Sequence, residues 1–427
     1  MLSFRQHKAL FVAVLIIVVA VSLLALHFSI NATSQTPTLP VPYIGVAYGG
    51  NTTIEAKAVI DRTKSYTNLF VLDSGRNPLS KNESAVEEVC DYAVANGLSV
   101  IVNVGVTTND TSQSTWFWHE PLDGIKQSWT QRWGDKFLGI YYNDEPGGIQ
   151  LDGNWTGWYH ENADKISEMG YPATDALYNI LLKMLNYCYN GTKPTDYNLE
   201  ANFYVQNVIK DDVGMIALKG TGIKTFTSDY CLYWFDYLGG YDVMFAEAGW
   251  NCSLSQQIAL VKGAARIQDK EWGVMVTYKT DRYGSPPYLD TGDNVYNQML
   301  LAYQSGAKYL TVFDYSPDGT GAGLLQDEHF NAMQRFWNDI HTKRFPDFSQ
   351  PNAVMVLPSN YGWGMRNPND TIWGFWSTDG KTLQIASTMS KLLATYGSSL
   401  DIIYDNSNYP ITKINYQHIY YWNNTTI

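Results

Sequence analysis

Eight short apolar segments, separated by helical patterns, limit the fold of this chain more than any other feature. Their apolar residues run almost without interruption, which is typical of strands covered on both faces in a parallel sheet. The segments cover residues 43–49, 68–75, 98–105, 137–142, 224–230, 241–249, 272–278 and 307–315. Eight such strands, each followed by a helix, predict a closed (β/α)8 barrel, an α/β fold, over residues 43–345.

The helical patterns fit this arrangement. They cover residues 53–65, 83–96, 123–133, 254–268, 294–305 and 327–341. A long excursion over residues 149–222 breaks the spacing and holds two further helical patterns, at 173–189 and 199–219. An open doubly wound sheet would need a glycine-rich phosphate turn after the first strand, and Gly45, Gly49 and Gly50 do not have that spacing.

A smaller unit follows the barrel. Beyond Pro351 the sequence predicts strands at 353–357 and 400–404, an apolar piece at 372–376 and a helix at 383–396. Residues 419–422 could pair as an edge strand. We therefore expect a small α/β domain over residues 351–427.

The N-terminus has the pattern of a membrane segment. Arg5 and Lys8 precede an uncharged apolar run from Ala9 to Leu26, which nearly matches the thickness of a bilayer. Because the apolar core of a cleaved signal peptide is usually about 7–15 residues long, the run favours a retained signal anchor over residues 1–30. Residues 31–42 then form an extended linker, and the body of the protein lies outside the cell, either anchored to the membrane or, if the N-terminal segment is cleaved, secreted.

Two further features agree with export. Asn-x-Ser/Thr sequons, the acceptor sites for N-glycosylation, start at Asn31, Asn51, Asn82, Asn109, Asn154, Asn190, Asn251, Asn369, Asn423 and Asn424. The four cysteines allow three full pairings, and a bridge between Cys231 and Cys252 is the preferred one, because each follows a predicted strand end.

Charge and spacing exclude several classes of partner. The net charge of −12, without basic clusters, argues against binding to nucleic acid and against docking on anionic lipid. No cysteine or histidine spacing suggests zinc, and we expect neither a metal nor a cofactor.

Polar and aromatic residues gather where the predicted strands end. In a (β/α)8 barrel these C-terminal strand ends carry function. Five of the eight supply a carboxylate, and Trp116, Trp118, Trp155, Trp158, Trp234 and Trp250 lie among the neighbouring loops. Acids with interleaved aromatic rings predict a sugar cleft. The expected substrate contacts are Tyr48, Asp73, Asn103, Trp118, Tyr142, Asp229, Trp250, Tyr278 and Asp314.

The fourth strand ends in the acids Asp144 and Glu145, followed by Pro146. Cleavage of a glycosidic bond needs one carboxyl that donates a proton and a second group that attacks, activates water or stabilises the cation. Glu145 is the predicted proton donor, because burial and the neighbouring Asp144 would raise its pKa. Glu247, at the end of the sixth strand, is the best second carboxylate. The alternative for each Glu is a structural acid bonded to a loop N–H.

The segment Asn143-Asp-Glu-Pro146 resembles the Asn-Glu-Pro signature of the large clan of retaining barrel glycosidases, in which that Glu is the acid/base. The unit after Pro351 is similar to the trimerisation-like domain that follows the barrel in some β-galactosidases of the clan. Residues 245–251 and 264–273 resemble segments of uncharacterised barrels predicted from archaeal genomes. The resemblance covers the barrel and the tail through short motifs.

Two departures from that clan leave several mechanisms open. Asp144 replaces Asn before the acid/base Glu, and Thr277 stands near the end of strand seven, where the clan has its nucleophilic Glu. The Asp-Glu pair also resembles that of β-N-acetylhexosaminidases, in which the Asp orients the substrate's own acetamido group as the nucleophile. This resemblance implies a catalytic Asp144. A third option is an inverting pair of Glu145 with Glu247 or Asp314.

The sequence thus predicts a membrane-anchored, outward-facing glycoside hydrolase that acts on a poly- or oligosaccharide. The alternative is a non-catalytic carbohydrate-binding or cell-envelope protein on a barrel scaffold. The missing Glu on strand seven favours the alternative.

Overall fold

The computed structural model describes residues 39–75, 77–105, 122–153, 196–249, 253–280, 287–315 and 323–423. Within these ranges no helix has the length and apolar character needed to span a bilayer. The expected signal anchor, the helix expected at 173–189 and five of the six loop tryptophans, all except Trp234, lie outside them.

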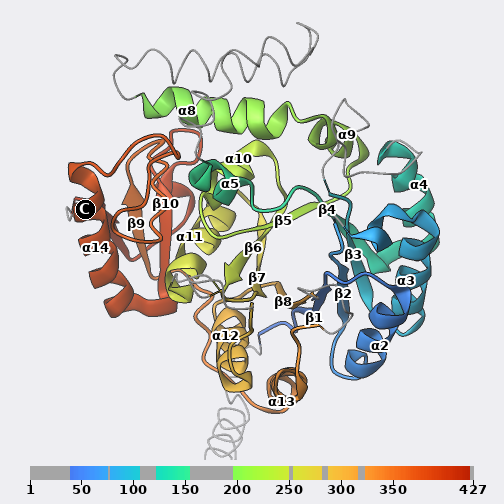
Figure 1. Cartoon of the computed structure of the whole chain (residues 1–427). Coiled ribbons are helices and arrows are strands. Elements are labelled where there is room, and N and C mark those ends of the chain that lie inside the picture. Colours follow the sequence, from blue (N-terminus) through green and yellow to red (C-terminus); the bar gives the residue numbers. More distant parts are fainter. Residues whose placement is uncertain are drawn as a thin grey trace, which may run out of the picture. The chain divides into compact units, whose positions relative to one another are not determined.

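Eight parallel strands close into a barrel in the order of the sequence, with β1 hydrogen bonded to both β2 and β8. Figure 1 shows the strands around a common centre, with helices on the outside. The prediction of a (β/α)8 barrel is confirmed. The strands are β1 (Tyr43–Tyr48), β2 (Leu69–Leu72), β3 (Ser99–Asn103), β4 (Phe137–Tyr141), β5 (Thr225–Asp229), β6 (Val243–Ala248), β7 (Glu271–Val276) and β8 (Tyr309–Asp314).

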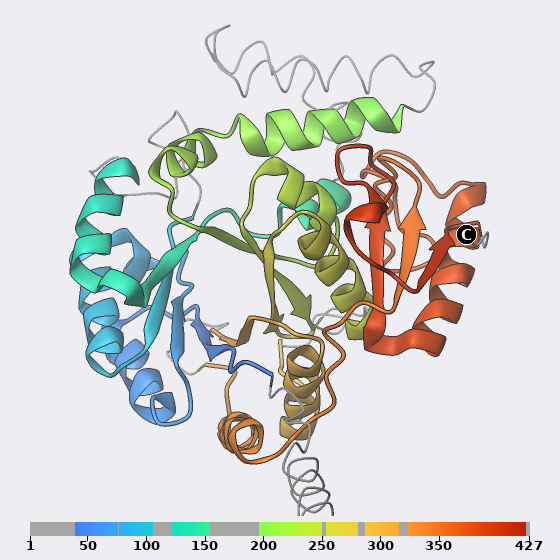
Figure 2. The same ribbon diagram turned by 180° about the vertical axis from the view of Figure 1, so that it is seen from behind.

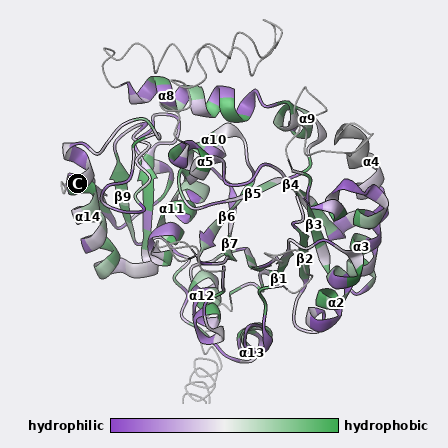
Figure 3. Ribbon diagram, viewed as in Figure 1, coloured by the Kyte–Doolittle hydropathy of each residue, from purple (hydrophilic) through white to green (hydrophobic). Residues whose placement is uncertain are grey.

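Most helices of the barrel lie where the sequence predicts them. They are α2 (Thr53–Thr63), α3 (Glu83–Ala95), α4 (Leu122–Trp133), α11 (Leu254–Ile267), α12 (Gly292–Gln304) and α13 (Asp327–Thr342). Side-chain caps define several starts, because Thr52, Asn82 and Thr291 each accept a hydrogen bond from a first-turn backbone N–H. Figure 3 shows hydrophilic and hydrophobic bands along α2 and α3, as expected for helices with one covered face.

The segment between β4 and β5 is more broken than expected. Its described part consists of α5 (Pro146–Asp152), α8 (Tyr197–Phe203), the π-helix η3 (Tyr204–Lys210) and α9 (Val213–Thr221). Helices α5 and α10 (Tyr233–Gly239) were not predicted. Helix α5 begins at Pro146, directly after the acids Asp144 and Glu145. Proline is well suited to the first helical position, because its nitrogen needs no hydrogen-bond partner in the helix.

The barrel interior is filled by side chains from alternating strand positions. The buried cluster consists of Ala47, Leu69, Val71, Ile101, Tyr141, Phe226, Val243, Phe245, Met275 and Tyr309. Trp234, expected in the cleft, is buried instead and packs against Tyr404 and Tyr409, with ring centroids 5.7 and 6.0 Å apart. Cys231 is a free, buried thiol. This contrasts with the expected bridge to Cys252, which lies outside the described residues.

The C-terminal unit is a small parallel sheet in the order β10-β9-β11. It contains β9 (Ala353–Leu357), α14 (Gly380–Tyr396), β10 (Leu400–Tyr404) and β11 (His418–Tyr421), and the expected edge strand is β11. Residues 372–376 form isolated bridges rather than a strand. Both views show this sheet beside α11 (Figures 1 and 2).

The contact of α11 with β10 is tight and contains buried charges. A Cβ on Gly263 would come within 2.5 Å of the Ile402 carbonyl oxygen, so only glycine fits. On the same helix, Lys262 and Arg266 form ion pairs with Asp401 at 3.4 and 3.1 Å. Asp401 is fully buried, so the removal of either cation would leave its charge poorly compensated.

Candidate active site

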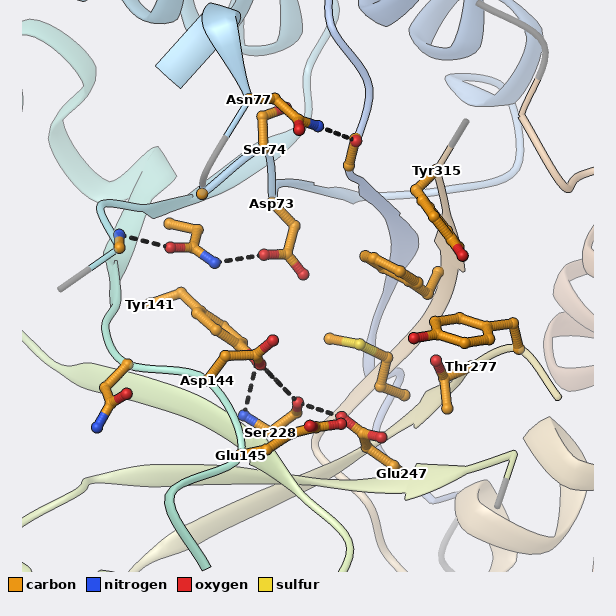
Figure 4. Close-up of a pocket in the computed structure, with 18 of the residues that line it drawn as sticks. Asp73, Ser74, Asn77, Tyr141, Asp144, Glu145, Ser228, Glu247, Thr277 and Tyr315 are labelled. Carbon is orange, nitrogen blue, oxygen red and sulfur yellow. Dashed lines mark hydrogen bonds between the residues drawn. The ribbon is translucent and has the colours of Figure 1, made fainter. Parts of the chain in front are cut away.

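A pocket of about 450 Å³ opens at the C-terminal ends of the barrel strands. Figure 4 shows acids, amides and aromatic rings converging on it. Its lining includes Asp73, Asn103, Tyr141, Asn143, Asp144, Glu145, Ser228, Glu247, Thr277, Tyr278, Phe313 and Tyr315. The predicted acids Asp73, Asp144, Glu145 and Glu247 therefore meet in one cavity, although they are far apart in the sequence. Asn103 and Tyr278, two of the expected substrate contacts, line it as well.

A hydrogen-bonded chain joins three of these strand ends. Ser228 Oγ donates to Glu247 Oε1 at 2.5 Å and lies 2.7 Å from the Tyr141 hydroxyl. Tyr141 accepts from the Ser228 backbone N–H at 3.0 Å and donates to Asp144. Since each hydroxyl carries one proton, the arrangement that serves both acids has Tyr141 donating to Asp144 and Ser228 donating to Glu247. Such bonds favour the ionised form of both carboxyls.

Glu145 is held by an uncommon backbone conformation. Its φ and ψ of 48° and 49° lie in the left-handed region, and φ of Asn143 is 56°. Non-glycine residues in this region cost of order 1–3 kcal/mol, and such strain clusters at functional sites. The Glu145 N–H donates to the Ser228 carbonyl at 3.2 Å, which ties the strained corner to β5. The turn aims the Glu145 side chain at Glu247 (Figure 4).

Glu145 and Glu247 line the same pocket, and the pKa of Glu145 is raised. Burial is the main cause that raises the pKa of Glu145 well above its ordinary value, followed by the negative charge of Glu247. Asp144 and Asp229 raise the pKa further, in that order. Because Ser228 stabilises the charged form of Glu247, the pair is best described as a protonated Glu145 beside an ionised Glu247.

Asp229, an expected substrate contact, instead binds the backbone of the turn that follows Glu145. It is fully buried and does not line the pocket. Its carboxylate accepts from the N–H groups of Gly147 and Gly148 at 2.5 and 3.0 Å and from that of Tyr230 at 2.7 Å. These bonds satisfy the first turn of α5, directly after Glu145. Asp229 is therefore placed to fix the acid rather than to touch a ligand.

Asp73 and Asn103 line the next strand ends. Asn103 Nδ2 donates to Asp73 Oδ1 at 2.5 Å, while Asn103 Oδ1 accepts from the Gly105 N–H at 2.7 Å. Burial, and then the charge of Asp144, raise the pKa of Asp73, and the bond from Asn103 opposes this. These two residues can bind the hydroxyl groups of a ligand.

Three aromatic rings form a wall of the pocket. Tyr278 lies 6.2 Å from Phe313 and 5.1 Å from Tyr315, and Phe313 stacks on Tyr315 at 5.5 Å, measured between ring centroids. Figure 4 shows Tyr315 across the pocket from Asp144. The faces of such rings suit the apolar C–H face of a sugar.

Three expected contacts point elsewhere. The Tyr48 hydroxyl donates to Glu55 at 3.1 Å, the Tyr142 hydroxyl donates to Asp212 at 2.6 Å, and Asp314 accepts from the Leu325 N–H at 3.0 Å. None of the three lines the pocket. Trp118 and Trp250 lie outside the described residues.

The sequence prediction did not single out Tyr141 and Ser228. Side chains of a strand alternate between its two faces. Choosing Tyr142 and Asp229 therefore pointed to the neighbours of the residues that face the cavity. Strand parity was the available signal, but the exact end of each strand was needed to use it.

Among the described residues, no group of three or more His, Cys, Asp and Glu side chains has an arrangement that could hold a metal ion.

Searches with the sequence found no matching family model and no matching curated protein. Several solved structures have a similar fold. A GH5_18 protein from Streptomyces cattleya in complex with GlcNAc is 11% identical with a TM-score of 0.48, covering 90% of this chain and 99% of its own. A β-galactosidase from the haloarchaeon Halorubrum lacusprofundi is 10% identical with a TM-score of 0.48, covering 86% and 68%. Likeness at this level carries no conclusion about activity.

Proposed function

We propose that this protein is a glycoside hydrolase that cleaves O-glycosidic bonds of a poly- or oligosaccharide, with Glu145 as the proton donor. One observation carries the proposal: Glu145, whose pKa is raised by burial and by Glu247, and Glu247, which accepts a hydrogen bond from Ser228, line one pocket at the C-terminal strand ends. An acid with a raised pKa keeps its proton at neutral pH and can pass it to a leaving oxygen.

The neighbouring carboxylates support the same reaction. The transition state of glycoside cleavage resembles an oxocarbenium ion, which anionic groups stabilise. Glu247 accepts a hydrogen bond from Ser228, and Asp144 accepts one from Tyr141. When the sugar ring gains positive charge in the transition state, the negative charges of the two acids stabilise it.

The geometry narrows the choice of second carboxylate. The negative charge of Glu247 helps to raise the pKa of Glu145, whereas Asp314 does not line the pocket. We therefore favour Asp144 as the group that activates water or orients a nucleophile on the substrate, with Glu247 setting the pKa of Glu145.

The test is the release of reducing sugar from a panel of glycans by the wild type and by Glu145→Gln. We expect the variant to lose at least about 100-fold in kcat, as is usual when a general acid is removed. Glu55→Gln is the matched control, because Glu55 accepts a hydrogen bond from Tyr48 outside the pocket. Equal activity of wild type and Glu145→Gln, or no activity on any glycan, contradicts the proposal.

A second candidate is a non-catalytic carbohydrate-binding protein. The contact between Glu145 and Glu247 and the presence of Thr277 in place of an acid favour it. Isothermal titration calorimetry with the same glycans separates the two candidates. Binding by the wild type without any turnover supports the second one.

We also propose that the protein is exported and remains anchored by residues 1–30, with the barrel outside the cell. Of the sequons in the described residues, Asn82, Asn369 and Asn423 are exposed and so available for glycosylation. Extraction of the full chain into buffer without detergent would contradict the anchor.

A further inference from the structure

We propose that the C-terminal unit is part of the catalytic apparatus, because its loop over residues 360–373 fixes helix α5 and thereby the position of Glu145. The inference rests on the proposed role of Glu145 as the acid. It assigns a positioning function to residues far from the pocket in sequence, namely Arg366, Thr371 and Trp373.

Helix α5 depends on outside contacts for its place. It has seven residues, two of them glycine, and begins at Pro146 directly after Glu145. So short a helix has no stability of its own in water, and glycine weakens it further. Asp229 binds its first turn, as described above. A second set of contacts is needed to fix its direction.

Three consecutive residues at the end of α5 supply that second set. Gln150 Nε2 donates to the Trp373 carbonyl at 2.9 Å, and the Thr371 hydroxyl donates to the Leu151 carbonyl at 3.3 Å. Asp152 forms an ion pair with Arg366 at 2.7 Å. The C-terminal unit thus contacts one turn of α5 in three ways: through the Gln150 side chain, the Leu151 backbone carbonyl and the Asp152 carboxylate.

The loop that makes these contacts is itself rigidly built. Arg366 forms two parallel bonds to the buried Asp370, at 2.8 and 2.7 Å, which is a bidentate geometry. Trp373 is fully buried with a left-handed φ of 58°, and its ring lies 4.6 Å from that of Phe235 on α10. A buried residue keeps such a strained backbone conformation only where the surrounding contacts hold it in place.

A shift of α5 would move the acid relative to the charges that face it. The titratable groups around Glu145 are Asp144 beside it in the turn, Tyr230 and Asp229 at the end of β5, Glu247 on β6 and Tyr278 after β7. Since the negative charge of Glu247 is, after burial, the largest cause that raises the pKa of Glu145, loosening α5 separates the pair and lets Glu145 ionise more easily.

The test combines two substitutions that leave the Arg366 to Asp370 pair intact, Asp152→Ala and Thr371→Val. The ionisation of Glu145 is followed by NMR of ¹³C-labelled glutamate carboxyls, assigned with Glu145→Gln, which needs no substrate. We expect the pKa of Glu145 to fall by about one unit and the basic limb of the kcat profile to move with it. The expected loss in kcat is about 10-fold, with KM within about twofold, as for a displaced catalytic group.

Lys413→Gln is the control, because Lys413 joins the C-terminal unit to Ile267 and Asp269 at the far end of α11. It should leave the pKa of Glu145 unchanged. If the double variant does not fold, Thr371→Val alone is measured in the same way.

The outcomes separate this inference from the proposed function. An unchanged pKa of Glu145, with only a lower Tm, overturns the positioning role whether or not glycans are cleaved. A shifted pKa in a protein that cleaves no glycan upholds the structural coupling and removes the hydrolase proposal.

Discussion

Glu247 lines the same pocket as Glu145, and its negative charge is, after burial, the largest cause that raises the pKa of Glu145. Two like charges in contact cannot both persist in a partly enclosed site. The protein therefore keeps an acid and its conjugate partner side by side at neutral pH, and Ser228 marks Glu247 as the ionised member.

Replacing Ser228 with Ala should change how the proton is distributed between Glu145 and Glu247. The variant loses the donor to Glu247 and so destabilises its charged form, by about 1.5–3 kcal/mol for a bond to a charged group. The ionisation that forms the acidic limb of the pH profile should shift to higher pH, and kcat should fall about tenfold at neutral pH. Ser305→Ala, which removes a helix-backbone bond far from the pocket, is the control. A profile identical to that of the wild type would refute the chain of bonds.

Glu200 should make stability depend on pH. Burial raises its pKa to about 8, and Gln150 is its hydrogen-bond partner at 3.3 Å. Below the unfolded pKa of about 4.3 both states are protonated, and between there and 8 only the unfolded state ionises, so stability falls as pH rises. Glu200→Gln should remove this loss, which is on the order of a few kcal/mol.

Urea unfolding at pH 5 and pH 8 checks the role of Glu200. The advantage of Glu200→Gln over the wild type should be larger at pH 8. A difference of the same size at both values would mean that Glu200 does not retain its proton on folding.

Gly148→Ala should displace the turn that holds Glu145, because the added methyl group would clash with a neighbouring ring. A Cβ there would come within 2.3 Å of the Tyr230 ring, so α5 or the ring must move. We expect a loss of about 1–3 kcal/mol in stability, typical of overpacking, together with lower activity. Gly220→Ala on α9 meets no atom within 4 Å and should be neutral or slightly stabilising. Thermal unfolding and glycan turnover measure both effects.

The aromatic wall should contribute mainly to binding. Tyr315→Leu removes a ring that stacks on Phe313 and contacts the tilted ring of Tyr278. KM should rise about fivefold with kcat nearly constant, the pattern of a contact made equally in ground and transition states. Tyr43→Leu breaks a stack with Tyr309 outside the pocket and should not raise KM. A fall in kcat with constant KM for Tyr315→Leu would exclude a platform role.

Much of the fold could be predicted from the sequence because parallel strands and amphipathic helices leave strong periodic signals. The barrel strands, most helices and the edge strand β11 lie within a few residues of the predicted ranges. The convergence of Asp73, Glu145 and Glu247 followed from the rule that strand ends meet at one rim.

The finer features had no local signal. The left-handed turn at Asn143 and Glu145 is held by contacts with β5 that only the folded structure shows. Without the exact end of β4, strand parity could not tell that Tyr141 faces the pocket and Tyr142 does not. Helix α5 was missed because Gly147 and Gly148 disfavour a helix in isolation. Their close approach to Asp229 and Tyr230, which requires glycine, is visible only in three dimensions.

The fit of Gly263 against Ile402 limits how such a protein can diversify. An exchange of the tail for that of another barrel would bring a new strand against a helix shaped for this backbone, and would leave Lys262 without Asp401. Recombination at residue 350 is thus expected to yield insoluble chimaeras unless α11 is transferred as well. We therefore expect helix α11 and the sheet that covers it to be exchangeable only together.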